Sequence, residues 1–501
     1  MIKYIAKRLL ISLMILFLGS LLLFVLVINS GDPLAALRES NDPNRENQMA
    51  QLTQRMGLDK PWYERYWDWL SKMLRGDFGI ASDGSEVNAL VVSAASSTLR
   101  MVVLASLLAI TIGITLGVLT AVRQYSGFDY AVTMMAFVFF SLPVFWFAVL
   151  LKHYAAIEFN NWIATAKFAP PMIVGVAAFL GLVIAAVVGG PWNRRLITFG
   201  ALFVAFAGVL FYFDAVTWFR RPAIGLPVYI LLVIGIAVML IVLTSGFGNK
   251  GVRNAVGVTA GVAIVGYAIM RGILMTSPSY WLLFLLLVVA IVVAVLAGQF
   301  LGGFSRRQAI FASVVTSLLA SVAALIDLLL SNWSNYLKVQ PRPIPTIGSA
   351  TANFSTTWWG HNIDLLTHIF LPTMALMLIS LASYTRYTRA SMLEVLNQDY
   401  IRTARSKGIS ERKVITRHAL RNSLIPLATI MAFDFAGLIG GAVITERVFG
   451  WQGMGAMFAS GLAAVDPTRV MAFYVVTGTA AVVMNMVADI AYAFLDPRIS
   501  R

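Results

Sequence analysis

Residues 281–300, WLLFLLLVVAIVVAVLAGQF, contain no charged side chain in 20 consecutive positions. An α-helix of that length is about 30 Å long, which is the thickness of the hydrocarbon core of a bilayer. Similar runs recur along the 501-residue chain, which is 59% hydrophobic and only 12% charged. The runs are continuous rather than alternating, which argues against the strands of a membrane barrel. The sequence therefore predicts an all-α, polytopic membrane protein.

Twelve such runs predict about twelve transmembrane helices, with both termini on the cytoplasmic side. The first, near 9–28, follows the basic opening MIKYIAKRLL and is longer than the roughly 7–15 apolar residues of a secretory signal, so we expect a retained span. Pro143 in SLPVFW should kink the third span. The others lie near 97–121, 130–156, 171–188, 196–213, 225–244, 255–272, 281–300, 309–330, 366–388, 427–447 and 470–492.

The basic residues predict the orientation of these spans. The net charge is +15, and in a membrane protein Lys and Arg collect in cytoplasmic loops, so we prefer this explanation to nucleic-acid binding. Paired basic residues near 194, 250 and 306 are expected on the cytoplasmic side. The basic residues near 220 and at 271 then fall on the extracytoplasmic side, which weakens the charge pattern.

A polar segment, 29–95, follows the first span and balances acids against bases, as an extracytoplasmic segment does. Pro61 should start a short helix in which Trp62, Tyr66, Trp69 and Met73 share one face. This aromatic stripe suits a helix lying in the bilayer interface. A packed core of a small outer domain is the alternative.

Several kinds of chemistry have no support in the sequence. The chain lacks cysteine, and GFGNKGVRN does not have the order of a nucleotide-binding loop. His361 and His368 lie seven apart without a carboxylate at a metal-site spacing, so no metal site and no cofactor is predicted for this chain. We expect a transport component rather than an enzyme.

Acidic residues inside membrane spans are costly and often functional. Asp327, Asp434 and Asp489 are the candidates. Asp434, in IMAFDFAGLIGGAV, is predicted to lie deepest and to face a translocation path. A hydrogen bond between helices is the alternative role.

The most basic part of the chain is YIRTARSKGISERKVITRHALRNSLIP, residues 400–426. Nine Lys and Arg stand against three acids between positions 386 and 421. Gly408 suits the left-handed residue after a helix, and Ser410 can cap a second helix with Glu411 in its first turn. Pro426 should kink or stop that second helix. We predict helix, glycine turn and helix at the inner membrane face, although an ordinary positive loop would have the same charge.

RTARSKG followed by RHALRNSLIP resembles the EAA loop of ABC-transporter permeases of the dipeptide/oligopeptide/nickel group. MIKYIAKRLL, GLDKPWYERYWDWL, SLPVFW, ERVFGWQGMG and the terminal DPRIS are similar to the same group, so the resemblance covers about 1–155 and 365–501. TAR stands where many families have Glu-Ala-Ala. By resemblance, the loop at 396–426, here the coupling loop, docks on an ATPase subunit. The implied contacts are Arg402, Thr403, Ala404, Arg405, Ser406, Lys407 and Gly408.

The resemblance also implies partners and a place of action. They are a second, similar permease, two ATPase subunits that hold ATP and Mg, a solute-binding protein and membrane lipid, without nucleic acid. The expected location is the plasma membrane of a prokaryote. The expected cargo is a peptide or a related solute, imported by alternating access. The main rival is a proton-coupled transporter that uses Asp434, and a membrane enzyme is the second.

The chain departs from this family pattern in one block, 157–364, which adds about six helices to a six-helix core. We expect the following division: a first helix at 1–28, the outer segment at 29–95, core helices at 96–156, the inserted block at 157–364, and the remaining core at 365–501. Lipid-facing padding or a partner contact is the preferred role of the block over a second transport path.

Overall fold

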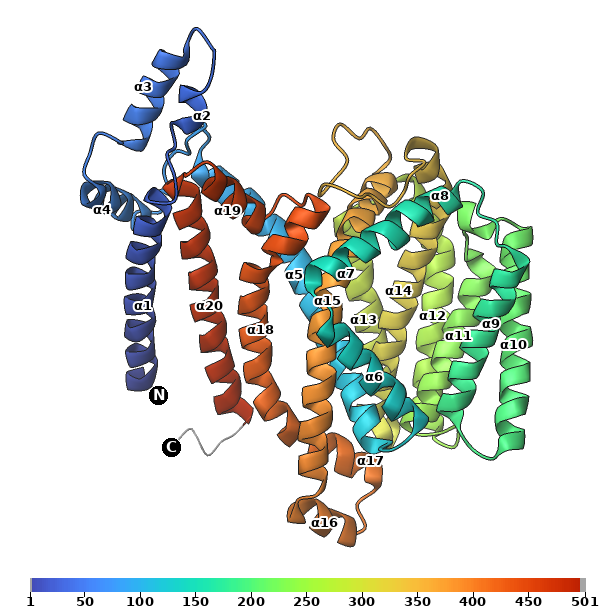
Figure 1. Cartoon of the computed structure of the whole chain (residues 1–501). Helices are drawn as coiled ribbons and strands as arrows, with labels where there is room; N and C mark the ends of the chain where they lie inside the picture. Colours follow the sequence, from blue (N-terminus) through green and yellow to red (C-terminus); the bar gives the residue numbers. More distant parts are fainter. Residues whose placement is uncertain (1, 496–501) are drawn as a thin grey trace.

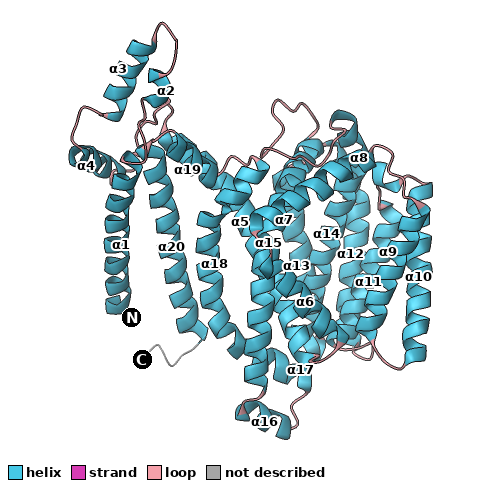
Figure 2. Ribbon diagram, viewed as in Figure 1, coloured by secondary structure: helices cyan, strands magenta, loops and turns pink. Residues whose placement is uncertain are grey.

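The computed structural model describes residues 2–495, with the backbone alone at 2–7, 187, 429, 432, 436, 438–441 and 488–495. The regular structure of this part is helical, apart from one isolated bridge between Ile80 and Glu86 (Figure 2). The motif DPRIS lies outside the described residues. The predicted all-α fold is confirmed for the described part of the chain.

Nine helices of the described part are long and apolar enough to cross a membrane, or ten with one bent pair. They are α1 (Ile2–Ile28), α5 (Val87–Val122), α10 (Trp192–Ala215), α11 (Gly225–Thr244), α12 (Lys250–Thr276), α13 (Tyr280–Leu301), α14 (Arg306–Val339), α15 (Trp358–Leu396) and α20 (Pro467–Leu495). Two further predicted runs lie in helices outside this count. They are α9 (Pro170–Val188), which has 19 residues and is shorter than the nine, and α18 (Leu420–Phe449), which has 30 residues.

The bent pair carries the predicted kink at Pro143. Helix α6 (Gly127–Ser141) and the helical stretch Val144–Ile163 meet at 106°. That stretch comprises α7 (Val144–Leu150), a π-helix (Leu151–Glu158) and α8 (Phe159–Ile163). Pro143 adopts an extended conformation, φ −61° and ψ 136°, because its ring cannot continue the helix before it. The kink is thus confirmed, as a sharp break.

Helices α5 and α15 form the centre of the molecule, with α18, α20 and α1 on one side and α9–α14 on the other (Figure 1). Gly113 and Gly117 of α5 lie one turn apart against α15. A Cβ at Gly117 would stand 2.5 Å from Thr388 Cβ and 2.8 Å from the carbonyl oxygen of Thr385. The two backbones therefore approach as closely as small residues at four-residue spacing permit.

We expect Gly117→Ala to destabilise the protein by about 2 kcal/mol, because the added methyl meets backbone that cannot rotate away. Gly200 of α10 is the matched control, since a Cβ there meets nothing within 4 Å. Thermal unfolding of the two purified variants in detergent measures the difference. Equal stability of both would show that α5 and α15 can separate without cost.

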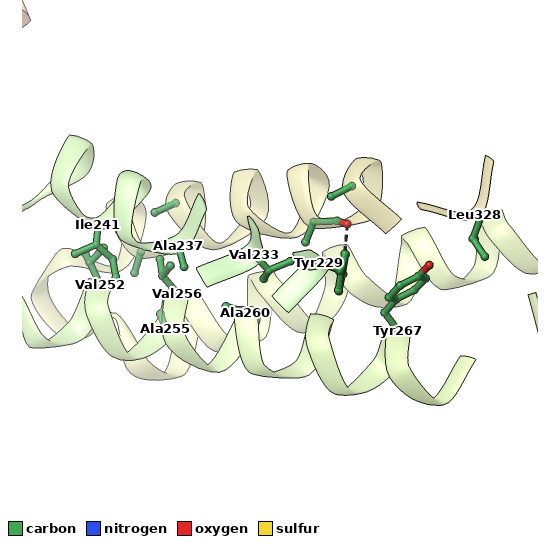
Figure 3. Close-up of a cluster of buried hydrophobic side chains, with 14 of the residues drawn as sticks. Tyr229, Val233, Ala237, Ile241, Val252, Ala255, Val256, Ala260, Tyr267 and Leu328 are labelled. Atoms are coloured by element: carbon green, nitrogen blue, oxygen red, sulfur yellow. Dashed lines mark hydrogen bonds between the residues drawn. The ribbon is translucent and has the colours of Figure 1, made fainter. Parts of the chain in front are cut away.

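The inserted block contains a hairpin and a bundle. None of the described side chains of α10 is buried, and α10 packs mainly on α9. Helices α11, α12 and α14 share a core of small and branched residues that leads from Ile241 and Val252 to the rings of Tyr229 and Tyr267, whose centroids lie 4.4 Å apart with their planes tilted by 49° (Figure 3).

The outer segment contains α2 (Ala35–Arg38), α3 (Arg45–Met56) and α4 (Trp62–Met73). Helix α4 begins directly after Pro61, as predicted. Tyr66 and Trp69 are buried against Phe24 of α1 and Met471 of α20, whereas Trp62 is 47% exposed. The aromatic stripe therefore packs across the ends of two spanning helices.

An ion pair ties this segment to the start of α20. Arg469 pairs with Asp83, and Asp466 accepts a hydrogen bond from the Ser82 backbone N–H at 2.7 Å. Hydrogen bonding from Ser85, assisted by Arg469, lowers the pKa of Asp83 to about 2. The Asp83 carboxylate therefore stays charged until the pH approaches about 2. The stability that this ion pair contributes is fully present above about pH 4 and is lost as the pH falls from about 4 toward about 2.

Candidate coupling and translocation site

Helix α16 (Asp399–Ser406) is short and two-faced. Ile401 and Ala404 are buried against Ala121 of α5 and Met392 of α15. Their spacing of three places them on one face, so the helix is held by packing rather than by its own length. The opposite face exposes Arg402, Thr403, Arg405, Ser406 and Lys407. Of the seven predicted contact residues, Ala404 alone is buried, and it seats the helix.

Gly408 ends α16 in the predicted way, with φ +73°. The N–H of Ile409 bonds to the carbonyl of Ala404 at 3.3 Å, and the N–H of Gly408 bonds to that of Arg405 at 2.9 Å. These two bonds form a Schellman motif, and Ile409 completes it by packing on the cluster that holds Ala404. A Cβ at Gly408 would meet nothing within 4 Å, so only the backbone conformation demands glycine here.

Ser410 stands at the N-cap of the next helix, α17 (Glu411–Lys413), but its side chain makes no capping bond. Glu411 instead binds Arg405 across the turn, with Nη2–Oε1 at 2.7 Å and Nε–Oε2 at 3.1 Å. This hydrogen bonding holds the pKa of Glu411 below its usual value. The prediction of a Ser410 side-chain cap was wrong, because the bidentate Arg405–Glu411 ion pair closes the turn instead.

The chain stays helical from Glu411 to Phe449. A π-helical stretch, Val414–Ala419, joins α17 to α18, and α18 continues through Pro426. The helix therefore does not stop at Pro426. Its irregularity lies upstream, where the wider π-helical turn leaves backbone bonds out of the usual register.

The coupling loop lies at one end of the molecule, where α16 projects beyond the other helices (Figure 1). Helices α10, α12 and α14, which carry the basic pairs near 194, 250 and 306, begin at the same end. Arg412 donates to the carbonyl of Leu243, at the C-terminus of α11. A cation at that position complements the helix dipole. No pattern in the sequence indicated this contact between the inserted block and the coupling loop.

The predicted intramembrane acids have different partners. Asp434 of α18 accepts a hydrogen bond from the Tyr384 hydroxyl of α15 at 2.7 Å and is half-buried. Asp327 is fully buried in the inserted bundle, where Tyr267, Arg271 and the Gly225 N–H all donate to it. The side chain of Asp489 lies outside the described residues.

An ion pair that the sequence reading missed joins α6 to α15. Asp129 is 2% exposed, and its two carboxylate oxygens accept hydrogen bonds from Nε and Nη2 of Arg389 at 2.7 and 2.8 Å. Asp129 also accepts from the Tyr125 N–H, and its own N–H bonds to Ser126, the N-cap of α6. The spacing S-x-x-D at Ser126 and Asp129 is a helix-start signal that could have drawn attention to it.

A second missed residue is Glu446, at the end of α18 remote from the coupling loop. It is fully buried and accepts bonds from the Thr98 hydroxyl at 2.6 Å and the Ala456 N–H at 3.0 Å. Thr98 in turn accepts from the Met454 N–H at 2.8 Å. Glu446 therefore anchors the start of α19 (Met454–Ala463) to α5.

The histidines were also considered as metal ligands. His368 bonds through Nδ1 to the Asp364 carbonyl oxygen at 2.7 Å. Within the described residues, no group of three or more His, Cys, Asp or Glu side chains could hold a metal ion.

Comparison with known families gives two matches. The family "Binding-protein-dependent transport system inner membrane component" matches residues 253–501, and the N-terminal model for the same kind of membrane component matches residues 1–115. Residues 116–252 fall outside both, which overlaps the predicted inserted block without coinciding with it.

Relatives agree with these matches. The chain is 25% identical over 502 residues to the oligopeptide transport system permease protein AppB of Bacillus subtilis, spanning 100% of this chain and 99% of that one. It is 34% identical over 226 residues to OppB of Mycobacterium bovis, covering 43% of this chain and 68% of OppB, so this chain is the longer. It is 40% identical over 147 residues to the dipeptide permease DppB of Escherichia coli, covering 29% of this chain and 43% of DppB.

The long apolar helices, the glycine-hinged basic loop at one end of α15 and these matches agree. The chain belongs to the family of binding-protein-dependent transport system inner-membrane components and is a multi-span permease subunit of an ABC transporter.

Proposed function

We propose that this permease forms part of the path of an ATP-driven importer for oligopeptides or dipeptides. The observation that carries the proposal is the exposed face of α16, held rigid by the Schellman turn at Gly408 and the Arg405–Glu411 pair. The relatives' names supply the cargo class, since they are oligopeptide and dipeptide permeases.

Coupling runs from α16 to the translocation path through two helices. Residues 402–408 meet an ATPase subunit that holds ATP and Mg, with Ala404 seating the helix from behind. Helix α15 ends where α16 begins, and Tyr384 lies 12 residues before that end, about 18 Å along the helix. A tilt of α15 relative to α18 would therefore act on the Tyr384–Asp434 hydrogen bond, which we place beside the path.

The transporter is completed by a second permease, a second ATPase subunit and a solute-binding protein that docks near the outer segment, 29–95. The nine helices, the bent pair, α9 and α18 form twelve spans in the plasma membrane of a prokaryote, with both termini cytoplasmic. Six belong to the core and six to the inserted block, 157–364.

Gentle extraction of the tagged chain from native membranes tests the proposal. ATPase subunits and a sister permease should copurify, and the preparation should hydrolyse ATP faster when a peptide-loaded binding protein is added. A chain that purifies alone, without ATPase activity in any detergent, would contradict an importer.

The proton-coupled rival predicts a different result for Asp434. In the importer, Asp434→Asn keeps a hydrogen-bond acceptor for Tyr384, and peptide uptake stays ATP-dependent and insensitive to a proton ionophore. In a proton-coupled carrier the same variant abolishes uptake, and the ionophore stops the unmodified protein. Tyr384→Phe is the control, because it removes the hydrogen bond and leaves the carboxylate.

A further inference from the structure

The bundle α11–α14 encloses a cavity of about 490 Å³, within the range of about 300–1,000 Å³ that holds small ligands. Its walls come from all four helices. On α12, which is Lys250–Thr276, the lining extends from Thr259 to Leu274 and so leaves out the first turns, at the end nearest the coupling loop. Those 15 positions correspond to about 22 Å along the helix. The lining is therefore longer than the hydrocarbon of one leaflet, which is about 15 Å or half the core thickness.

The cavity exists because the bundle is tightly packed in one half and open in the other. Near the coupling-loop end, a Cβ at Gly298 would lie 2.5 Å from Ile310 Cα, and one at Gly251 would lie 2.7 Å from the Gly302 carbonyl oxygen. In the other half, a Cβ at Gly266, which lines the cavity, would meet nothing within 4 Å. The helices touch by their backbones at one end and diverge from there.

The chemistry of the walls selects an apolar ligand. Every lining residue is uncharged, and most are aliphatic. The charged groups at the far end satisfy one another, because Asp327 accepts from both Tyr267 and Arg271, and Arg271 also donates to Ser331. The hydroxyl of Thr259 donates to the Ala255 carbonyl of its own helix.

The cavity opens toward the bilayer. Three of its lining residues, Val262, Phe284 and Val322, are 44%, 60% and 53% exposed, and they lie on spanning helices. An apolar cavity does not hold ordered water, since water needs two to four polar partners. The medium at this mouth is lipid hydrocarbon.

We propose that this cavity binds one acyl chain of a bilayer phospholipid, which enters from the leaflet remote from the coupling loop. The bound chain completes the packing of α12, α13 and α14 where their own side chains do not meet. The site is independent of the transported solute and of the ATPase subunits.

Photolabelling of the full chain in phospholipid nanodiscs tests the site. A phospholipid with a diazirine on one acyl chain is incorporated, and labelled peptides are identified by mass spectrometry. Peptides of α12 and α13 that line the cavity should be labelled several-fold more than α10, which packs on α9, has no buried side chain among those described and does not line the cavity. Gly266→Phe places a ring in the cavity and should reduce that labelling to the level of α10.

Gly261→Phe is the matched control, because Gly261 is on the same helix, a Cβ there also meets nothing within 4 Å, and it does not line the cavity. Unchanged thermal unfolding of both variants in detergent reports that they are folded. Ala290→Phe fills the cavity from α13 and provides a second variant. Cavity labelling equal to that of α10, or unaffected by either filling variant, overturns the proposal. Labelling by a diazirine fatty acid but not by the phospholipid would also overturn it.

Discussion

Replacing Gly408 with valine is expected to uncouple ATP hydrolysis from transport while the chain still inserts and assembles. The residue has φ +73°, and an L-residue in that region costs about 1–2 kcal/mol, more when branched at Cβ. The surroundings are open, so the cost falls on the Schellman turn and not on packing. Relaxing that turn rotates α16 relative to α17 and breaks the Arg405–Glu411 alignment.

The measurement compares peptide uptake by cells with ATP hydrolysis by the purified transporter, with and without loaded binding protein. Gly303→Val is the matched control. Gly303 also has positive φ, +51°, with nothing within 4 Å of a Cβ, and it precedes α14, which begins at the coupling-loop end, but lies outside the coupling loop. Normal uptake by the Gly408 variant would remove the coupling role from this turn.

Replacing Arg389 with alanine is expected to destabilise the permease by about 3 kcal/mol. The change leaves the Asp129 carboxylate, whose side chain is 3% exposed, without its cation, and an uncompensated buried charge is strongly destabilising. We place the effect at the low end of the range because Arg389 itself keeps 27% exposure. Adding Asp129→Asn to the Arg389 variant should recover part of the loss, which distinguishes a stranded charge from lost packing.

Arg386 provides the control on the same helix. Its guanidinium lies over the ring of Phe140, 4.3 Å from the centroid, and such a contact is worth about 0.5–1 kcal/mol at a partly exposed site. The chain has 12 tryptophans and no cysteine, so intrinsic fluorescence can follow thermal unfolding where thiol-reactive dyes cannot. Equal melting temperatures for the two alanine variants would mean that the Asp129–Arg389 pair contributes no more than a surface contact.

Predictions that rest on local physics agree best with the structure. Eleven of the twelve apolar runs each lie in one helix, and the twelfth, 130–156, breaks at Pro143 as expected. Helix α4 begins after Pro61. The left-handed Gly408 after α16 follows the same logic. Length, hydrophobicity and the backbone limits of proline and glycine act over a few residues, so they can be read from the chain alone.

The failures concern the partners of polar and charged side chains. Ser410 was expected to cap a helix through its side chain, but Arg405 and Glu411, six positions apart, close that turn. The other missed partners lie far apart in sequence. Asp129 meets Arg389 across 260 positions, and Arg412 reaches α11 across 169. Charged side chains have many possible partners, and only the packing of helices chooses among them.

The sequence by itself therefore determined that this protein is a helical membrane protein with a glycine turn in a basic loop, and the resemblance of its motifs supplied the permease class. Bilayer insertion and local backbone sterics require no knowledge of which helices are neighbours. The tertiary structure decided the rest: the close approach of α5 and α15, the Asp129–Arg389 and Tyr384–Asp434 contacts, and the cavity in α11–α14. Those features depend on which small residues meet and where helices diverge, and that is a property of the packed bundle as a whole.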